Sequence, residues 1–254
     1  MPSILRPPPP GRLHRTRAFE IPGLPGRYPL TLWLPPNYER ETKRYPVAYM
    51  FDGQNLFGDA GSFSGGWHLH EALDERARKG KTVPIVVGIH HGGASRMEEL
   101  SPWAIGRGSH GRGDALLAWI THGLAQMIRE DVRVLEGPEH TMLGGSSLGG
   151  LMTVYGFSQH PQFFGSCLAM SPALWVKRAA IFQVAERAPV GRASRVYIDC
   201  GGREGHVFQL AEGMAHLFAR KGVENVMWRP DKRGSHNERN WRRRLPKALR
   251  HLYG

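Results

Sequence analysis

The sequence predicts a single α/β domain in which helices cover both faces of a mostly parallel sheet. Its length of 254 residues suits one full core, and a content of 41 % hydrophobic and 9 % aromatic residues is typical of a globular protein. After an opening pair of strands, short apolar runs alternate with segments of helical period, which indicates strand–helix–strand units. No internal repeat and no linker divides residues 13–254.

The expected elements follow one another in a regular order. Residues 1–12, which include a run of prolines, are expected to form a flexible N-terminus. Proline–glycine pairs between residues 22 and 26 separate the first two strands. Strands are expected at 16–21, 28–34, 45–51, 83–89, 141–143, 163–170, 195–200 and 225–229, and helices at 67–79, 114–130, directly after residue 147, and at 172–187, 205–221 and 237–252.

One stretch carries the signature of a catalytic serine. A short apolar strand at 141–143 leads into glycines, a serine and a helix-compatible segment, so that Gly145, Ser147 and Gly149 form a Gly-x-Ser-x-Gly nucleophile elbow. The neighbours must be small because the strand and helix backbones pass close to each other at such a turn. Ser146 does not fit the same frame, since Leu148 would take its second glycine position. Ser147 is therefore the predicted nucleophile.

A base and an acid are expected on loops that follow later strands, in the chain order nucleophile, acid, histidine. His236 lies in the loop after the last strand, just before the final helix, and it alone among thirteen histidines has this position. Asp199 and Glu204 compete for the acid. Asp199 lies within the strand at 195–200 and could point into the sheet, whereas Glu204 follows in a loop that can reach His236. Glu204 is the favoured acid.

The oxyanion hole needs two backbone N–H groups. Leu148, directly after the nucleophile and at the start of a helix, is expected to supply one of them. The second should come from the loop after the strand at 45–51. There Gln54 is the preferred donor, and Gly53 or Asn55 stay possible.

Ordered landmarks along the chain resemble the putative-esterase family of α/β-hydrolases. That family includes enterochelin-type siderophore esterases, feruloyl and acetyl-xylan esterases, esterase D-like hydrolases and mycolyltransferases. The landmarks cover about residues 13–254. They are Leu-Trp-Leu-Pro-Pro-Asn-Tyr at 32–38, Phe-Asp-Gly-Gln-Asn-Leu-Phe at 51–57, Val-Val-Gly-Ile at 86–89, Arg96 and Glu99, Ser-Pro-Trp at 101–103, Gly-Ser-Ser-Leu-Gly-Gly at 145–150, Met-Ser-Pro-Ala-Leu-Trp at 170–175, Gly-Gly-Arg-Glu at 201–204 and Gly-Ser-His-Asn-Glu at 234–238.

The resemblance implies an α/β-hydrolase fold and supports two assignments. In this family the acid is commonly a glutamate at the place of Glu204, and the residue two after the Asp-Gly aspartate, here Gln54, lines the oxyanion hole. Some siderophore esterases of this type work with a Ser/His pair alone. The connection after the strand at 163–170 holds only a short helix, so no large lid domain is expected.

The substrate pocket is expected at the carboxyl ends of the strands. His90, followed by His91, departs from the family pattern, in which an acidic or amide residue tends to stand there. Large aromatic residues are more often core than ligand-binding residues, but the tryptophans here occur in or near loops. The expected pocket residues are Asp52, Asn55, Trp67, His90, Trp103 and Trp175.

Neither a metal nor a cofactor is expected. The histidines at 68 and 70 and the pair His90-His91 lack the His-Glu-x-x-His spacing, and adjacent histidines on an extended strand point apart. Cys167 and Cys200 occur in apolar runs and are expected to be buried free thiols.

The net charge of +12 raises the question of a polyanionic partner. Most of the positive charge is arginine scattered along the chain, and the one dense cluster, residues 242–244, lies in an expected helix. No zinc-finger, basic-zipper or RNA-binding signature occurs, so a solvated arginine-rich surface is favoured over nucleic-acid binding. No stretch has the length of a membrane span or a signal peptide, and a cytoplasmic location is expected.

The sequence therefore predicts a serine carboxylic-ester hydrolase that acts on a small-molecule ester through an acyl-enzyme. The alternatives on the same triad are acyl transfer and the cleavage of thioesters or amides. An alternative of another class is a catalytically idle hydrolase-like binding protein. No oligomeric state is indicated.

Overall fold

The structure is a computed structural model that describes residues 10–62 and 64–254. The strands are β1 (Arg12–Arg15), β2 (Phe19–Glu20), β3 (Arg27–Tyr28), β4 (Leu30–Leu34), β5 (Val47–Phe51), β6 (Ile85–Ile89), β7 (Thr141–Ser146), β8 (Ser166–Met170), β9 (Arg195–Gly201) and β10 (Asn225–Asp231). The helices are α1 (Leu69–Arg78), α2 (Arg96–Glu99), α3 (Gly113–Trp119), α4 (Ala125–Asp131), α5 (Leu148–Gln159), α6 (Val176–Ala179), α7 (Ile181–Arg187), α8 (His206–Arg220) and α9 (Glu238–Tyr253), with short 3₁₀ turns between them.

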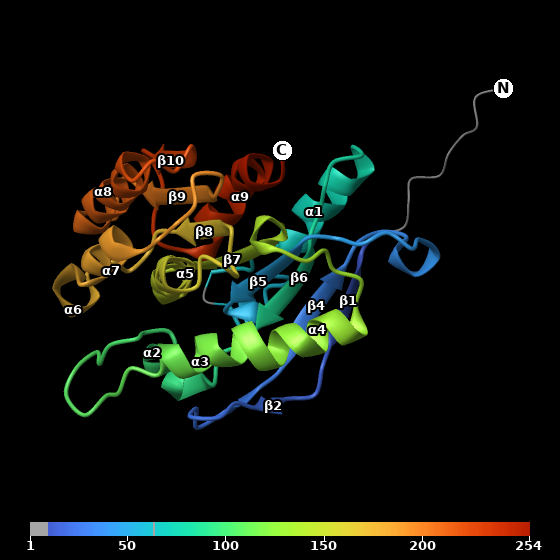
Figure 1. The fold of residues 1–254 in the computed structure, drawn as a ribbon, viewed down its shortest axis with the longest axis horizontal. Coiled ribbons are helices and arrows are strands. Elements are labelled where there is room, and N and C mark those ends of the chain that lie inside the picture. The colour runs from blue at the N-terminus through green and yellow to red at the C-terminus, as the bar shows by residue number, and fades with distance from the viewer. Residues whose placement is uncertain (1–9, 63) are drawn as a thin grey trace.

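Eight strands form one sheet in the order β1-β4-β6-β5-β7-β8-β9-β10 (Figure 1). The six strands from β6 to β10 in this order run parallel, while β4 is antiparallel to both β1 and β6. All parallel strands therefore end at one edge of the sheet, which is where loops from distant parts of the chain can meet. β7 lies near the centre, and β2 pairs only with β3.

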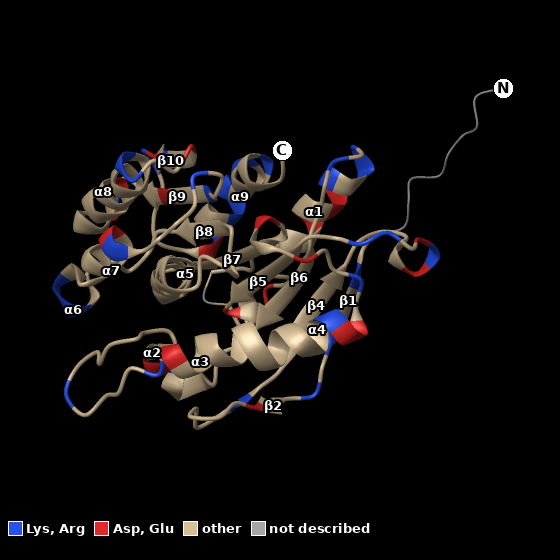
Figure 2. Ribbon diagram, viewed as in Figure 1, with Lys and Arg blue, Asp and Glu red and all other residues tan. Residues whose placement is uncertain are grey.

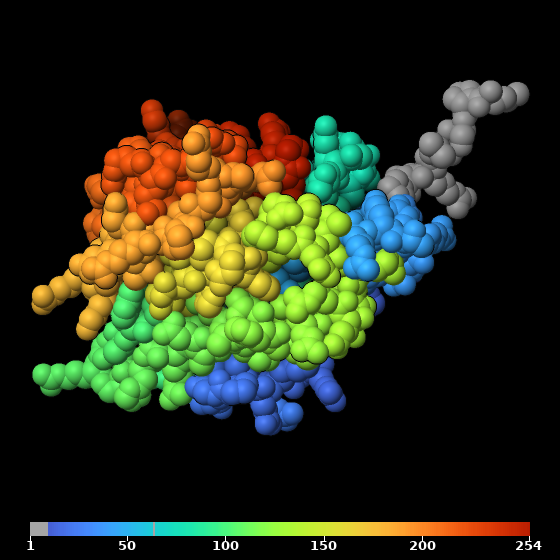
Figure 3. Space-filling view, viewed as in Figure 1, coloured from blue at the N-terminus to red at the C-terminus, as the bar shows by residue number. Residues whose placement is uncertain are grey.

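Helices cover both faces of the sheet, as the sequence predicts. Alternate residues of one strand belong to two different cores: Tyr49 of β5 packs in the first and Met50 in the second. The first core lies under α3 to α5, α7 and α8, and the second lies under α1 and α9. In Figure 3 the yellow segment around α5 lies between the green α2–α4 segment and much of the later part of the chain (orange and red).

The N-terminal region differs from the expectation. Arg12 already belongs to β1, an exposed strand with no apolar alternation that is held by backbone pairing with β4. Its charged residues cannot signal a buried strand, which is why the sequence pattern missed it. The expected strand at 16–21 shrinks to β2, and Pro29 divides the strand expected at 28–34 into β3 and β4. The flexibility expected for residues 1–9 lies outside the described residues.

Two expected helices are interrupted. The segment at 114–130 contains a π-helical turn at Ile120–Leu124 between α3 and α4. The segment at 172–187 is split into α6 and α7, and Lys177 and Arg178 within α6 have left-handed backbone angles. Cys167 and Cys200 are buried free thiols, as expected.

Lysine and arginine residues are distributed over helices and loops along the whole fold (Figure 2). Helix α9 carries several of them on the side that faces away from the core. In the described part of the chain, no helix combines the length and the apolar character that a membrane crossing requires.

Candidate active site

The chain turns sharply at Ser147, between β7 and α5. Ser147 has φ 56° and ψ −122°, a conformation that a non-glycine residue adopts only at a cost of about 1–3 kcal/mol. A Cβ atom on Gly145 would lie 2.8 Å from the backbone of Gly149, so only glycine fits at that position. The predicted elbow geometry is therefore present, with Ser147 at the N-terminus of a helix twelve residues long.

His236 and Glu204 are in direct contact. Nδ1 of His236 lies 2.7 Å from Oε2 of Glu204. The Glu204 side chain is 2 % exposed, whereas that of His236 is 42 % exposed, so a buried carboxylate meets an imidazole at the surface. Burial disfavours the charged form of Glu204, but hydrogen bonds from His236, Ser171 and Gly201 outweigh it and hold the pKa of this carboxyl below its usual value.

Asp199, the other candidate acid, lies elsewhere in the structure. It is fully buried in β9, where Nε of Arg244 approaches its Oδ2 to 3.1 Å and the Tyr197 hydroxyl donates to the same oxygen. Burial raises the pKa of Asp199 to about 7, and the Arg244 guanidinium opposes this shift. In the described chain no hydrogen bond or ion pair joins Asp199 to His236.

The other carboxylate oxygen of Glu204, Oε1, accepts two hydrogen bonds. The Ser171 hydroxyl donates to Oε1 of Glu204 at 2.8 Å, and the Gly201 N–H donates to the same atom at 2.7 Å. Trp241 and Arg244, both from α9, donate to the Ser171 hydroxyl. Arg244 is 4 % exposed, so it is not part of the solvated arginine-rich surface expected from the sequence.

The two backbone N–H groups that are expected to bind an oxyanion are unpaired in the described chain. Leu148 N–H lies at the start of α5, and Gln54 N–H lies in the 3₁₀ turn Gly53–Asn55; neither has an acceptor within the described residues. The turn lies beside the elbow, since a Cβ atom on Gly149 would be 3.3 Å from Oδ2 of Asp52. Such unpaired donors are what an oxyanion hole requires.

Asp52 anchors this turn. It has a left-handed backbone (φ 56°, ψ 47°), and both of its carboxylate oxygens accept hydrogen bonds of 2.7 Å from the Arg96 guanidinium. A bidentate arginine–carboxylate pair fixes orientation as well as distance. Asp52 therefore holds the turn through Arg96, and it is Arg96 that reaches the cleft described next.

Ser147, Leu148, Glu204 and His236 line one cleft of about 420 Å³ at the carboxyl ends of β7, β9 and β10. Its other walls are mainly apolar. Met97 and Trp175, which are 48 % and 45 % exposed, are two of the three exposed large hydrophobic residues in the described chain. The remaining lining residues are Arg96, Ala173 and Val207.

Trp175 is the one expected pocket tryptophan that lines this cleft. Trp67 is 2 % exposed and packs in the core against Trp241, with ring centroids 6.0 Å apart, so it supports the site from beneath. Trp103 packs edge-on against Tyr155. Trp67 is therefore a core residue and not a pocket residue, whereas Trp103 is half-buried and does not line the cleft around Ser147.

His90 lies beside the cleft in a separate depression. It lines that depression together with Gln54, and its Nε2 is 2.8 Å from the Thr31 hydroxyl. Burial lowers the pKa of His90 to about 4, so the ring is neutral near pH 7. Asn55 lines neither space; its buried Oδ1 has no hydrogen-bond partner in the described chain.

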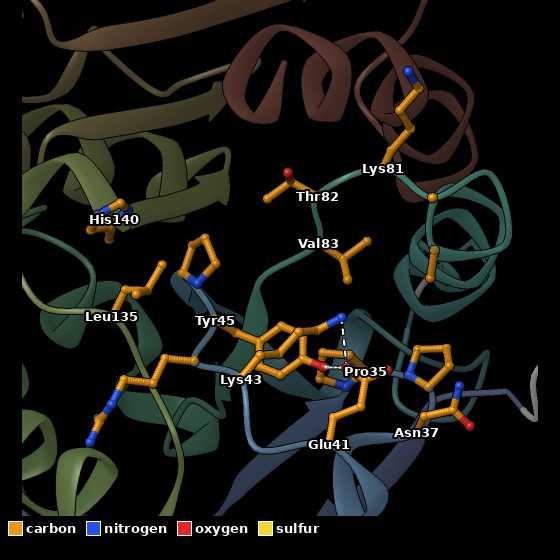
Figure 4. A pocket seen from close by; sticks show the side chains of 15 residues that line it. Pro35, Asn37, Glu41, Lys43, Tyr45, Lys81, Thr82, Val83, Leu135 and His140 are labelled. Atoms are coloured by element: carbon orange, nitrogen blue, oxygen red, sulfur yellow. Dashed lines mark hydrogen bonds and ion pairs between the residues drawn. The ribbon is translucent and has the colours of Figure 1, made fainter.

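A larger cavity, of about 550 Å³, lies at the opposite end of the strands, near the starts of β5, β6 and β7. Figure 4 shows the side chains that line it. There Glu41 lies 2.7 Å from Lys43 and accepts a hydrogen bond from the Tyr45 hydroxyl, so the polar groups satisfy one another. Among the described residues, no three His, Cys, Asp or Glu side chains are arranged to hold a metal ion.

Sequence reasoning did not single out Met97, Val207, Ser171 and Arg244 as site residues. For Arg244 a signal exists: it lies three residues after Trp241 and next to Leu245, on the apolar side of α9. For the others, the contacts join residues far apart in the chain, and only the fold brings them together.

Known proteins resemble this chain in sequence and in fold. A sequence model of the putative esterase family matches residues 22–252. Uncharacterized protein YbbA of Bacillus subtilis (strain 168) is 25 % identical over 246 residues, which cover 90 % of this chain and 94 % of that protein. A ferulic acid esterase structure is similar with a TM-score of 0.75 and 17 % identity, over 96 % of this chain and 98 % of that one. The enterobactin esterase FES from Shigella flexneri, solved in the presence of enterobactin, gives a TM-score of 0.76 at 19 % identity and covers 98 % of this chain and 60 % of that one.

The structural similarities extend over nearly the whole chain and establish the α/β-hydrolase fold, with no large lid evident. The family match spans most of the sequence, from the turn after β2 to the end of α9. The protein therefore belongs to the putative esterase family and is a hydrolase that acts on esters.

Proposed function

We propose that the protein is a serine carboxylic-ester hydrolase in which Ser147, His236 and Glu204 act as a catalytic triad. The observation that carries the proposal is the 2.7 Å contact between His236 and the buried Glu204, in the same cleft as a serine held in a strained backbone conformation. A nucleophile, a base and a group that orients the base are the three parts that acyl transfer requires.

The first half of the reaction forms an acyl-enzyme. Ser147 Oγ attacks the ester carbonyl carbon while His236 Nε2, which has no hydrogen-bond partner in the described chain, takes the hydroxyl proton. The negative charge on the carbonyl oxygen is bound by the N–H groups of Leu148 and Gln54. The C–O bond to the alcohol then breaks, and the imidazolium returns its proton to the leaving alcohol oxygen.

The second half restores the enzyme. His236 takes a proton from a water molecule as the water attacks the acyl carbon, and the bond to Ser147 Oγ breaks with transfer of that proton to the serine. Throughout, Glu204 keeps the Nδ1 proton in place and stabilises the imidazolium electrostatically. No residue in this sequence of steps requires a cofactor.

The cleft favours esters with an apolar or aromatic group. Met97, Trp175 and Val207 offer apolar surface beside the nucleophile, and exposed aromatic rings stack well on planar groups. Structural relatives include enzymes named for ferulic acid and enterobactin, which agrees with this preference. We therefore expect aryl-acyl esters to be cleaved with lower KM than acetyl esters of the same alcohol.

Replacement of the nucleophile tests the function directly. Ser147→Ala should lower kcat for p-nitrophenyl esters by about 10⁴-fold or more, because no other hydroxyl occupies the elbow. Ser146→Ala is a matched control in the same strand and should keep nearly full activity, since Ser146 is buried and does not line the cleft. Mass spectrometry with a slowly turned-over ester should find an acyl adduct on Ser147. Activity that survives Ser147→Ala would reject the triad, and a folded wild type inert on a broad ester panel would favour a binding protein.

A further inference from the structure

The residue beneath the candidate triad, Ser171, has a conformation that needs an explanation. It follows β8 directly, is fully buried, and has φ 43°, in the left-handed region that non-glycine residues rarely adopt. A glycine would adopt this backbone without strain. The serine side chain is thus present despite a conformational cost, which points to its hydroxyl group.

That hydroxyl group has all of its hydrogen-bonding capacity in use. A serine hydroxyl has one proton to donate and two lone pairs to accept with. Trp241 Nε1 donates to Ser171 Oγ at 3.1 Å, and Arg244 Nη2 donates to it at 2.9 Å. With both lone pairs occupied, the one proton is directed to Glu204 Oε1, which lies 2.8 Å away.

The hydrogen bonds to Oε1 of Glu204 determine which oxygen is left for His236. Oε1 accepts from Ser171 and from the Gly201 N–H, and this leaves Oε2 to His236. A carboxylate with donors on Oε1 stays ionised, so His236 must carry its proton on Nδ1 in order to bond with Oε2. Nε2 of the neutral ring is then unprotonated, as a general base requires.

Arg244 is itself held in place by charge. Its Nε lies 3.1 Å from Asp199 Oδ2, and its Nη1 lies 3.9 Å from Glu204 Oε1 and 4.0 Å from Asp231 Oδ2. Asp199 is fixed in turn by the Tyr197 hydroxyl and the Ser171 N–H. Arg244 Nε and Nη1 make no hydrogen bond in the described chain, so these carboxylates hold the guanidinium by charge, while Nη2 makes its one hydrogen bond to Ser171.

We propose that Ser171 is a positioning residue of the triad: donors from Arg244 and Trp241 force its hydroxyl proton onto Glu204 Oε1, and this fixes the His236 tautomer that can act as a base. Asp199, the rejected candidate acid, has the supporting role of holding Arg244. The inference rests on the proposed function, since it acts only through Glu204.

A double-mutant cycle between Ser171 and Glu204 tests the inference. Ser171→Ala should lower kcat for a p-nitrophenyl ester about 10- to 100-fold with KM changed less than about twofold, because ground-state binding does not involve this hydroxyl. In the Glu204→Gln background the same replacement should change kcat less than about twofold, since the pathway through Glu204 is already lost. Equal losses in both backgrounds, or no loss in the wild type, would overturn the proposal.

Ser171→Gly distinguishes the effect of losing the hydroxyl from the effect of backbone strain. Glycine relaxes the positive φ and keeps the fold, so this variant should lose as much activity as Ser171→Ala if the hydroxyl matters. A glycine variant with wild-type kcat would show that Ser171 acts through packing, and it would overturn the proposal. Ser158→Ala is the matched control: Ser158 is buried in α5, its hydroxyl has no partner in the described chain, and its loss should leave kcat unchanged.

Active-site titration distinguishes this inference from the proposed function. Diethyl p-nitrophenyl phosphate should release one nitrophenolate per chain from wild type and from the Ser171 variants, more slowly from the variants, and none from Ser147→Ala. Without stoichiometric labelling of wild type the triad itself fails. With labelling but equal rates in wild type and the Ser171 variants, only the positioning role fails.

Discussion

The two ends of the sheet offer a contrast in how polar groups are arranged. The larger cavity, at the starts of the parallel strands, contains glutamate, lysine, tyrosine and histidine side chains, yet Glu41, Lys43 and Tyr45 satisfy one another. Its left-handed residues are Asn37 and Gly80, types that tolerate this conformation at little cost.

The smaller cleft at the other end has the opposite character. Ser147 is strained although it is neither glycine nor asparagine, and the N–H groups of Leu148 and Gln54 have no acceptor in the described chain. Unmet hydrogen-bonding capacity and local strain persist only where the surrounding structure enforces them. Cavity size is therefore a poor guide in this fold, and unsatisfied groups beside a strained residue are a better one.

The largest difference should appear when one histidine at each end of the sheet is replaced by glutamine. His236→Gln removes the proposed base and should lower kcat by about 10⁴-fold or more, whereas His140→Gln in the larger cavity should leave kcat within about twofold of wild type. Steady-state rates on a p-nitrophenyl ester measure both. Comparable losses in the two variants would mean that the larger cavity takes part in the reaction.

A smaller effect is expected from replacing Asp52, which holds the turn that carries Gln54. Asp52→Asn removes the charge that holds Arg96 and loosens the turn that carries Gln54, so kcat should fall about tenfold. Glu98→Gln is the control: Glu98 lies in α2, as Arg96 does, and the change breaks its 3.0 Å ion pair with Arg112 without touching the cleft. If Glu98→Gln costs as much as Asp52→Asn, the loss reflects the stability of α2 rather than the position of the turn.

The last effect concerns stability rather than rate, and it arises at His90. Burial lowers the pKa of His90 to about 4 in the folded protein, from 6.5 when exposed. The unfolded chain therefore binds a proton more readily, so this contribution to stability is complete above pH 6.5 and is lost as the pH falls towards 4. The loss between pH 8 and pH 5 should be about 2 kcal/mol.

His90→Gln should remove that part of the acid sensitivity while its amide keeps a hydrogen bond to Thr31. Urea unfolding of the wild type and the variant at pH 8 and pH 5 measures the difference. Equal acid losses in the two proteins would show that His90 is not the group that responds. The elbow variants Ser146→Ala and Ser147→Ala should show the same acid loss as wild type.

Much of the fold follows from local pattern. The buried parallel strands are short apolar runs, and the elbow glycines are dictated by backbone packing within five residues, so both can be predicted from the sequence. β1 could not be, because it is an exposed edge strand held by backbone hydrogen bonds that leave no mark on its side chains.

In the candidate site, too, some features follow from local sequence and others depend on the fold. The order of Ser147, Glu204 and His236 along the chain was enough to place them on loops at one edge of the sheet. Trp67 was expected at the rim, but it packs under Trp241, and nothing near residue 67 in the sequence reveals that partner. The link from Ser171 to Arg244 joins residues 73 positions apart, and it depends on how α9 docks.

Helix α9 follows every strand of the sheet, and it contributes Trp241, whose ring meets the His236 imidazole edge-on with centroids 5.1 Å apart, together with Arg244. During synthesis the elbow emerges from the ribosome well before this helix. A nascent chain thus displays its serine without a base to activate it, and with the triad proposed here ester cleavage begins only when α9 has docked.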